Sequence, residues 1–180
     1  MVYPLSSMGA HVSVTPNHQM FRNTPLATRA NVAYFGVFGY ELDINKLSEE
    51  EQEEIKQQIS FAKQYRKLIH KGTFYRLLSP FEGNLAAWIV VSDDRKDAVM
   101  GYYKILNDVI CPYRRLKLRG LDAGMDYVIE GITGSYSGKE LMNAGLITTD
   151  ASAGQVLDGG GTCTDFWSRI YVLHGIKKEV

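Results

Sequence analysis

The chain has 180 residues, of which 45% are hydrophobic, 11% aromatic and 22% charged, a composition that excludes disordered and collagen-like proteins. Its 20 basic and 20 acidic residues cancel, so no overall charge draws the molecule to nucleic acid or to an anionic membrane surface. No apolar run approaches the roughly 20 residues that cross a bilayer. We therefore expect neither a nucleic-acid partner nor a membrane.

Cysteine and histidine usage bears on location and on metal binding. Cys111 and Cys163 are too few for a disulfide framework and the chain start lacks a basic leader, so we expect a cytoplasmic protein with free thiols. The four histidines are scattered over the whole length: His11, His18, His70 and His174. Because no Cys/His group has zinc-site spacing and no loop has the calcium pattern, we expect no metal and no cofactor.

The first elements follow an irregular start. Residues 1–8 are a short apolar run that predicts a strand, and residues 9–23 are rich in turn formers and polar side chains. Thr24 as N-cap, with Pro25 in the first helical position, predicts a helix. Two glycines, Gly36 and Gly39, close or break this helix.

The clearest local signal is the segment Leu47-Ser48-Glu49-Glu50-Glu51. It forms a capping box, in which Ser48 bonds the N–H of Glu51 while the Glu51 side chain reaches back. Apolar residues then recur at intervals of three and four. We predict one amphipathic helix over Ser48–His70, ended by Gly72, with His70 as a residue of its last turn rather than a catalytic base.

After Gly72 the sequence alternates between apolar runs and turns. These runs predict strands over residues 73–78, 86–91, 97–106, 115–118, 126–130 and 168–173. No long helical pattern separates them, so we expect an antiparallel sheet, and the length of this half favours a β-sandwich. Residues 139–143 are read as a short turn of helix or a linker. The chain is thus expected to contain two domains, 1–72 and 73–180.

Three motifs match reactive sites only in part. The glycine-rich segment Asp158–Thr162 lacks the lysine of a phosphate-binding loop, so it is read as a loop. Residues 134–138 lack the glycine spacing of a nucleophile elbow. The pair Asp93-Asp94 lies between two hydrophobic runs, where aspartate favours a turn. None of the three motifs identifies a catalytic group.

A more specific pattern opens the chain. The segment Met8-Gly9-Ala10-His11-Val12-Ser13 is followed by Pro16-Asn17-His18-Gln19, by Thr28-Arg29 and by Phe35-Gly36-Val37-Phe38-Gly39-Tyr40-Glu41-Leu42. This pattern resembles the C-terminal third of bacterial α-galactosidases of glycoside hydrolase family 36. The likeness continues through residues 74–80 and 88–91 to residues 113–116, and it is weak over residues 147–164.

The resemblance implies an α+β, mostly β fold. Residues 1–72 would supply the last strand and closing helices of a (β/α)8 barrel, and residues 73–180 a C-terminal antiparallel β-sandwich. It also implies retaining hydrolysis of terminal α-linked galactose from melibiose and raffinose-type sugars, with one aspartate as nucleophile and another as acid/base. The implied partners are α-galactoside sugars bound by the complete enzyme, and a homo-oligomer or association with the missing barrel.

Neither family stretch that carries a catalytic aspartate, a Lys-Trp-Asp type and a Ser-Asp type, occurs in this chain. The resemblance therefore assigns no catalytic residue here, and we expect the chain alone to be inactive. Barrel active sites lie at the C-terminal ends of the strands. With a last strand over residues 1–8, Met8, Gly9 and His11 become the candidates for residues near the sugar. For His11 we favour the alternative of a hydrogen-bonded loop histidine that orients the strand end.

Two further functions stay open. One is a free-standing carbohydrate-binding or assembly module, which would stack sugars on exposed aromatic rings. The candidate rings are Tyr102, Tyr103, Tyr113 and Trp167. The same side chains also fit a core or cross-strand pairs. The other function is one half of a split glycosidase, whose barrel comes from another polypeptide.

Overall fold

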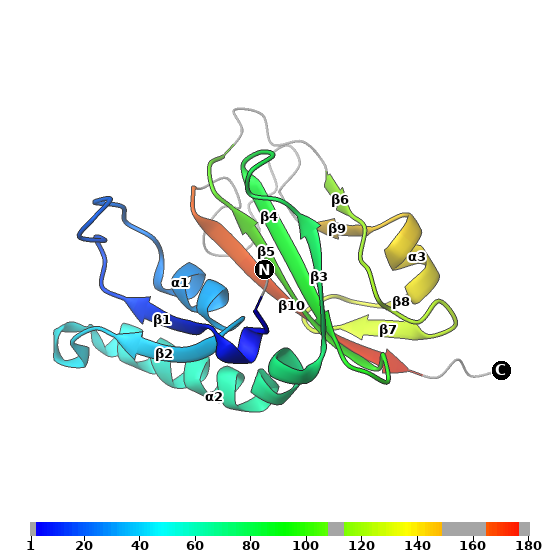
Figure 1. Ribbon diagram of the computed structural model, residues 1–180, viewed down its shortest axis with the longest axis horizontal. Helices are drawn as coiled ribbons and strands as arrows, with labels where there is room; N and C mark the ends of the chain where they lie inside the picture. The colour runs from blue at the N-terminus through cyan, green and yellow to red at the C-terminus, as the bar shows by residue number, and fades with distance from the viewer. Residues whose placement is uncertain (1–2, 108–113, 149–164, 177–180) are drawn as a thin grey trace. The chain divides into compact units, whose positions relative to one another are not determined.

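The computed structural model describes residues 3–107, 114–148 and 165–176 (Figure 1). The chain forms two compact units, Met1–Gly72 (unit 1) and Thr73–Val180 (the second unit). Tyr113, the two cysteines and the glycine-rich segment Asp158–Thr162 lie outside the described residues. Among the described residues, no helix is both long enough and apolar enough to span a membrane.

The first unit is built on a parallel strand pair with helices. Its elements in chain order are η1 (Leu5–Ser7), β1 (Gly9–Ser13), α1 (Leu26–Ala33), β2 (Val37–Glu41), η2 (Ile44–Lys46) and α2 (Glu49–Lys71). Strands β1 and β2 pair in parallel, from Gly9 opposite Val37 to Ser13 opposite Glu41. Parallel neighbours need a long crossover connection, and α1 with its flanking loops supplies it. In Figure 1 both arrows accordingly point the same way.

The strand predicted over residues 1–8 is wrong. Leu5–Ser7 form a 3-10 turn, in which the Ser7 N–H and hydroxyl both donate to the Pro4 carbonyl at 3.0 and 2.9 Å. The strand follows at Gly9–Ser13, within the segment read as turns. Val12 is fully buried there. The apolar run at the chain start therefore does not form the strand. The position of the strand is set instead by pairing with a segment far along the chain, Val37–Glu41.

The first helix and its end also differ from the prediction. Helix α1 starts at Leu26 with Pro25 as its N-cap, one residue later than expected. Thr24 is used by the preceding loop instead, since its N–H donates to Thr15 Oγ1 at 3.3 Å. The two glycines expected to close or break the helix lie beyond its end: Gly36 directly precedes β2, and Gly39 lies within it. Gly36 passes so close to β1 that an added Cβ would lie 2.7 Å from the Ala10 Cβ.

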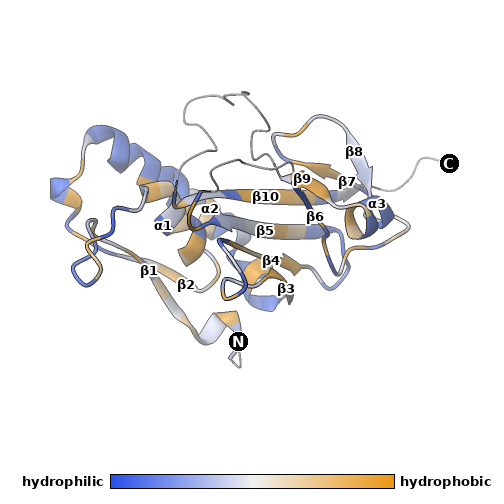
Figure 2. Ribbon diagram, turned by 90° about the horizontal axis from the view of Figure 1, so that it is seen from above, coloured by the Kyte–Doolittle hydropathy of each residue, from blue (hydrophilic) through white to orange (hydrophobic). Residues whose placement is uncertain are grey.

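Helix α2 confirms the capping-box prediction. The Glu51 N–H donates to Ser48 Oγ at 3.2 Å, and the Ser48 N–H donates to Glu51 Oε2 at 3.0 Å. The helix ends at Lys71, where the Gly72 N–H donates to the Leu68 carbonyl at 2.7 Å. Its buried side chains are Ile55, Gln58, Tyr65 and Ile69. The rest of the helix is largely hydrophilic (Figure 2).

The second unit is mostly β. Its elements are β3 (Thr73–Leu78), β4 (Leu85–Val91), β5 (Asp97–Lys104), β6 (Arg114–Leu116), β7 (Asp126–Ile129), β8 (Ser135–Ser137), α3 (Gly138–Asn143), β9 (Leu146–Thr148) and β10 (Trp167–Ile176). A six-stranded sheet has the order β3-β4-β5-β10-β7-β8, and β6 pairs with β9 in a second sheet. Every pair is antiparallel, as predicted. The large sheet does not close on itself.

The core of this unit lies against one face of the six-stranded sheet. The sheet contributes Ala87, Ile89, Val91, Ala98, Met100, Tyr102, Tyr127, Ile129, Tyr171 and Leu173. The chain between β6 and β9, with α3, covers them with Leu116, Leu118, Leu121, Leu141 and Leu146. Residues 139–143 lie in a short helix, one of the two predicted alternatives. The strands β8 and β9, three residues each, were not predicted.

Candidate functional site

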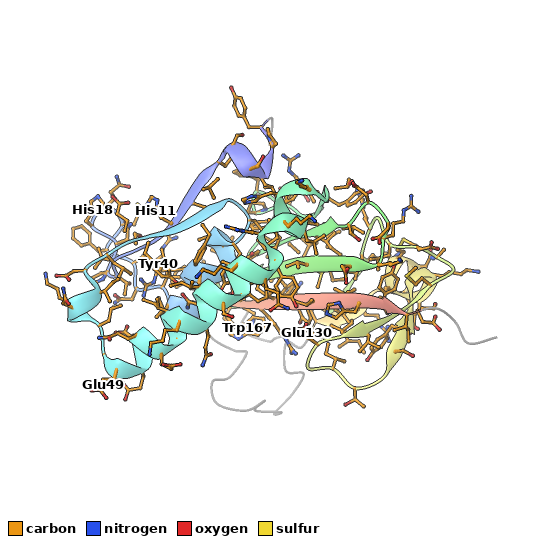
Figure 3. The ribbon with its side chains drawn as sticks, turned by 90° about the horizontal axis from the view of Figure 1, so that it is seen from below. His11, His18, Tyr40, Glu49, Glu130 and Trp167 are labelled. Atoms are coloured by element: carbon orange, nitrogen blue, oxygen red, sulfur yellow. The ribbon has the colours of Figure 1, made fainter. Side chains whose placement is uncertain are left out.

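The carboxyl ends of β1 and β2 lie side by side, because the strands run parallel and Ser13 is opposite Glu41. Ligand sites of parallel α/β folds gather at this edge. Figure 3 labels His11 on β1 and His18 on the segment that follows it. The side chains at this edge and just beyond it are therefore the candidates for a site.

The two faces of the β1–β2 pair differ. Val12 is fully buried, and Tyr40 opposite it donates to a side chain of α2, so this face packs on the helices. Strand alternation places His11, Ser13 and Glu41 on the other face, here named the open face. The His11 and Glu41 side chains are 54% and 73% exposed. The side chains of His11, Ser13 and Glu41 therefore point away from the helices of unit 1.

An imidazole–carboxylate pair crosses the open face. His11 Nε2 lies 2.6 Å from Glu41 Oε2, and the pair links β1 to β2. His11 is thus a strand residue held by a carboxylate, which corrects the alternative of a loop histidine. A carboxylate partner sets the orientation and tautomer of an imidazole ring. The pair presents hydrogen-bonding groups that suit a polyhydroxyl ligand.

Met8 and Gly9 lie at the opposite end of β1. The strand begins at Gly9, so both residues occupy its amino end rather than its carboxyl end. The Met8 carbonyl accepts the Val37 N–H at 2.7 Å and so helps to pair the strands. The geometric reason for placing Met8 and Gly9 near a sugar was wrong, and their contact with a ligand stays a prediction.

Arg29 of α1 ties this helix to the carboxyl end of β1. Its Nη1 donates to the Ser13 carbonyl, and its Nε donates to the Thr24 carbonyl at 3.0 Å. Burial lowers the pKa of Arg29, while Glu51 and Glu54 raise it. The sequence contained Arg29 only as part of the Thr-Arg motif. The position of Arg29 near the start of the predicted helix was the only sequence signal for a contact between this helix and the preceding segment.

Residues 14–24, here named the β1–α1 loop, are ordered by hydrogen bonds of their own. Asn17 Oδ1 accepts the N–H groups of Gln19 and Met20, both at 3.0 Å. The Phe21 N–H donates to the Asn17 carbonyl at 2.7 Å, and the Asn17 N–H donates to the Arg22 carbonyl at 3.0 Å. This arrangement presents apolar side chains, since Met20 is 66% and Phe21 80% exposed. Sequence reasoning saw the turn formers and missed these side chains.

A pocket of about 300 Å³ lies between β2 and α2 within unit 1. Its lining includes Phe38, Tyr40, Ile59, Lys63, Arg66 and His70. Tyr40 Oη donates to Gln58 Oε1 at 2.8 Å, and Gln58 Nε2 donates to Glu54 Oε1 at 2.8 Å. Burial, helped by Glu54, raises the pKa of Tyr40 to about 12, so the phenol stays protonated. His70 Nε2 lies 3.0 Å from the Gly36 carbonyl, which confirms a structural place in the last turn of α2.

The aromatic side chains proposed for sugar stacking in the second unit are mostly internal. Tyr102 is 1% and Tyr103 5% exposed, so neither offers a free face. Trp167 is half-buried and meets Tyr102 edge-on, with ring centroids 6.2 Å apart. Trp88 packs on Tyr103 at 4.4 Å. The core and cross-strand interpretation is therefore confirmed for Tyr102 and Tyr103.

The partial motifs within the described residues have structural roles. Asp94 Oδ1 accepts from Ser92 Oγ at 2.7 Å and from the Lys96 N–H at 3.1 Å, bonds that lower the Asp94 pKa and form the predicted turn. Ser137 caps α3, because its Oγ accepts the Glu140 N–H at 3.1 Å. Across the described ranges, no three His, Cys, Asp or Glu side chains are placed to hold a metal ion.

A carboxylate–imidazole–carboxylate array joins three strands of the six-stranded sheet. His174 of β10 places Nδ1 2.8 Å from Asp97 Oδ1 of β5, and Nε2 3.0 Å from Oε1 of Glu130, which follows β7. The Glu130 bond is the main cause that raises the His174 pKa, with Asp97 adding to it against desolvation. The side chain is 43% exposed, so solvent weakens these interactions.

We expect the stability of the second unit to fall as pH rises above about 6.5, the ordinary histidine pKa. The folded His174 pKa is raised, so its contribution is complete below the unfolded pKa and disappears as pH passes the folded value. Urea unfolding of the wild type and His174→Gln between pH 6 and pH 9 measures this loss. The variant should show a smaller decrease, and His18→Gln should behave like the wild type; equal slopes for all three would contradict the assignment.

Comparison with known families covers both units. A family model described as Melibiase matches residues 1–72. A second model, described as the glycosyl hydrolase family 36 C-terminal domain, matches residues 85–173. The two matches follow each other along the chain in the order of the two compact units.

The relatives that match this chain in sequence are alpha-galactosidases by name. The chain is 56% identical over 146 residues to alpha-galactosidase AgaA of Geobacillus stearothermophilus, with 81% of this chain and 20% of that protein covered. It is 42% identical over 144 residues to the bifunctional alpha-galactosidase/sucrose kinase AgaSK of Mediterraneibacter gnavus, with 80% and 15% covered. The chain thus spans about a fifth or less of the length of these relatives.

Solved structures agree with the sequence matches. The alpha-galactosidase of Lactobacillus brevis superposes with a TM-score of 0.89 at 43% identity, covering 99% of this chain and 24% of that one. AgaA of Geobacillus stearothermophilus gives 0.88 at 49% identity, covering 97% and 23%. Variants of the latter protein have been solved in complex with raffinose and with stachyose.

Proposed function

Because this chain belongs to glycoside hydrolase family 36, we propose that it is the C-terminal part of an α-galactosidase, which hydrolyses terminal α-linked galactose with retention of configuration. The observation that carries the proposal is the order of the two units. A parallel strand–helix–strand–helix unit precedes an antiparallel sheet, and each coincides with one of the two consecutive family matches.

In this proposal residues 1–72 complete a (β/α)8 barrel and residues 73–180 form a β-sandwich domain. A barrel of this kind takes about 250 residues and eight parallel strands. Unit 1 contributes two parallel strands, β1 and β2, each followed by a helix, where only the last strand of the barrel was expected from the sequence. That pattern is the repeating element of the barrel. The sandwich is supported by the second, two-stranded sheet, β6 with β9, whose segment covers the core face of the large sheet.

We further propose that the chain alone is inactive. Retaining hydrolysis requires two carboxyl groups on opposite sides of the scissile bond. The family stretches that carry them do not occur in this sequence. The one carboxylate on the open face, Glu41, is already paired with His11. The substrate is accordingly an α-galactoside bound by the complete enzyme.

Association with further protein belongs to the same proposal. Unit 1 exposes several large apolar side chains on its strands, helices and loops, among them Tyr3, Val14, Met20, Val32, Val37 and Ile44. Exposed apolar surface of this kind favours association with the missing barrel or with further copies. Having only two cysteines is consistent with a cytoplasmic enzyme. The buried Tyr102 and Tyr103 do not favour the free-standing sugar-binding module.

A chimera tests the proposal. Residues 1–180 would replace the matching C-terminal stretch of Geobacillus stearothermophilus AgaA, and galactose release from raffinose would be measured. We expect the chimera to hydrolyse raffinose, and residues 1–180 alone, or the upstream part alone, to release no galactose. A folded but inactive chimera, or hydrolysis by residues 1–180 alone, would contradict the proposal.

The same two parts, produced as separate chains and mixed, distinguish a split enzyme. Activity on mixing would show that the pieces associate without a covalent link. Activity of the fused chimera only would favour a single polypeptide. Circular dichroism of each part, compared with that of the chimera, controls for loss of folding.

A further inference from the structure

We propose that Phe21, at the tip of the β1–α1 loop, contacts the part of an oligosaccharide that lies beyond its terminal galactose. This inference rests on the proposed function and deepens it, because it concerns which α-galactosides the site accepts. The ligand class is a neutral sugar unit attached to galactose. The contact is a stacking contact between the Phe21 ring and the apolar face of that unit.

The position of the β1–α1 loop in the fold supports this contact. The β1–α1 loop leaves the carboxyl end of β1, the edge at which barrel enzymes bind their substrates. The open face with His11 and Glu41 lies on the strands themselves, whereas Phe21 lies eight residues beyond the last strand residue, Ser13. The loop therefore continues directly from the strand whose open face carries His11.

The Phe21 side chain is exposed while its backbone is held in place. Phe21 is 80% exposed within unit 1, yet the Asn17 hydrogen bonds hold its backbone. A ring on an ordered loop loses little freedom when it meets a ligand. Phe21 also has φ of +50°, a left-handed conformation that is an outlier for a bulky residue. Strain of this kind persists where surrounding contacts impose it, and it gathers at ligand sites.

The chemistry of the loop suits a sugar. One face of a pyranose ring carries C–H groups that pack on an aromatic ring, and its edge carries hydroxyl groups. His18, three residues before Phe21, is exposed, and its imidazole can donate to or accept from those hydroxyls. The solved complexes of AgaA variants contain raffinose and stachyose. Both are oligosaccharides with sugar units beyond the terminal galactose.

The left-handed backbone suggests the variants. Phe21→Gly removes the ring at a φ that glycine adopts without strain, so it should not impair folding. Phe21→Tyr keeps an aromatic face. Phe81→Ala is the matched control, because Phe81 is 96% exposed but lies in the β3–β4 loop of the other unit. Every variant would be made in the AgaA chimera described above.

The experiment compares kcat/KM for stachyose or raffinose with kcat/KM for α-galactosyl fluoride, whose leaving group contains no sugar. We expect Phe21→Gly to lower the ratio of these two constants about fivefold, the size of one aromatic contact. Phe21→Tyr should keep the ratio within about twofold of the wild type, and Phe81→Ala should leave it unchanged.

Two results would overturn the inference. An equal loss on both substrates would mean that Phe21 packs on another part of the enzyme, and an unchanged ratio would mean that it contacts no ligand. These outcomes leave the proposed function intact, because the wild-type chimera hydrolyses raffinose in each. A folded wild-type chimera without activity on either substrate would instead refute both proposals.

Discussion

Gly36→Val should break the pairing between β1 and β2. A Cβ at Gly36 would lie 2.7 Å from the Ala10 Cβ and 2.8 Å from the Met8 carbonyl oxygen, both on or beside β1. Because backbone must move to relieve these contacts, we expect a cost of about 3 kcal/mol. Amide hydrogen exchange across β1 should then be about a hundredfold faster than in the wild type.

Gly39→Val is the matched control for this change. Gly39 lies on β2 itself, and an added Cβ meets nothing within 4 Å. Gly39 is half-buried but leaves room for a larger side chain, and valine suits a strand position, so exchange across β1 should stay close to the wild-type rate. If Gly36→Val and Gly39→Val gave the same protection, the close approach at Gly36 would not be what sets the strand pairing.

Ile129→Ala should lower the free energy of unfolding of the second unit by about 2–5 kcal/mol. Ile129 is 1% exposed and belongs to the core cluster against the six-stranded sheet. Truncation removes buried methyl groups and leaves a cavity that the neighbouring side chains fill only in part. Urea unfolding followed by the fluorescence of the two tryptophans, both in this unit, measures the change.

The neighbouring residue of β7 provides the comparison. Val128 points to the opposite side of the strand and is 38% exposed. Val128→Ala should cost about 0.5 kcal/mol, because little buried area is lost. Similar losses for Ile129→Ala and Val128→Ala would show that the core does not lie on the face to which the structure assigns it.

Local signals were sufficient for some elements. The Ser48–Glu51 capping box and the apolar spacing that follows it involve residues within one or two turns, so helix α2 could be predicted almost to the residue. Six of the antiparallel strands could be predicted because they are short segments rich in apolar and aromatic residues between turn formers. The Asp93-Asp94 turn likewise uses bonds between near neighbours, Ser92 and Lys96.

Other elements depend on distant partners and could not be predicted. Strand β1 exists because Gly9–Ser13 pair with Val37–Glu41, across the intervening helix α1. Strands β8 and β9 are three residues long and are defined by pairing with β7 and β6. Short segments have too little intrinsic preference to reveal a strand. The sequence therefore placed the first strand one segment too early.

The candidate site shows the same limit. His11 was selected by its place just beyond the strand expected over residues 1–8, but its partner Glu41 belongs to the other strand and was not paired with it from sequence. Met8 and Gly9 were selected because a strand was expected before them, over residues 1–8. In the structure the strand begins at Gly9 and continues after it. Phe21 was passed over, because exposure and a left-handed φ are not visible in a sequence.

By itself the sequence determined the family, through short motifs spread over both units, and it determined the elements whose hydrogen bonds and apolar spacing are local. The tertiary structure decided the parallel pairing of β1 with β2 and the open face that this pairing creates. It also decided the array of His174 with Asp97 and Glu130. The physical reason is common to all three, since each depends on hydrogen bonds or ion pairs between groups that only the folded chain brings together.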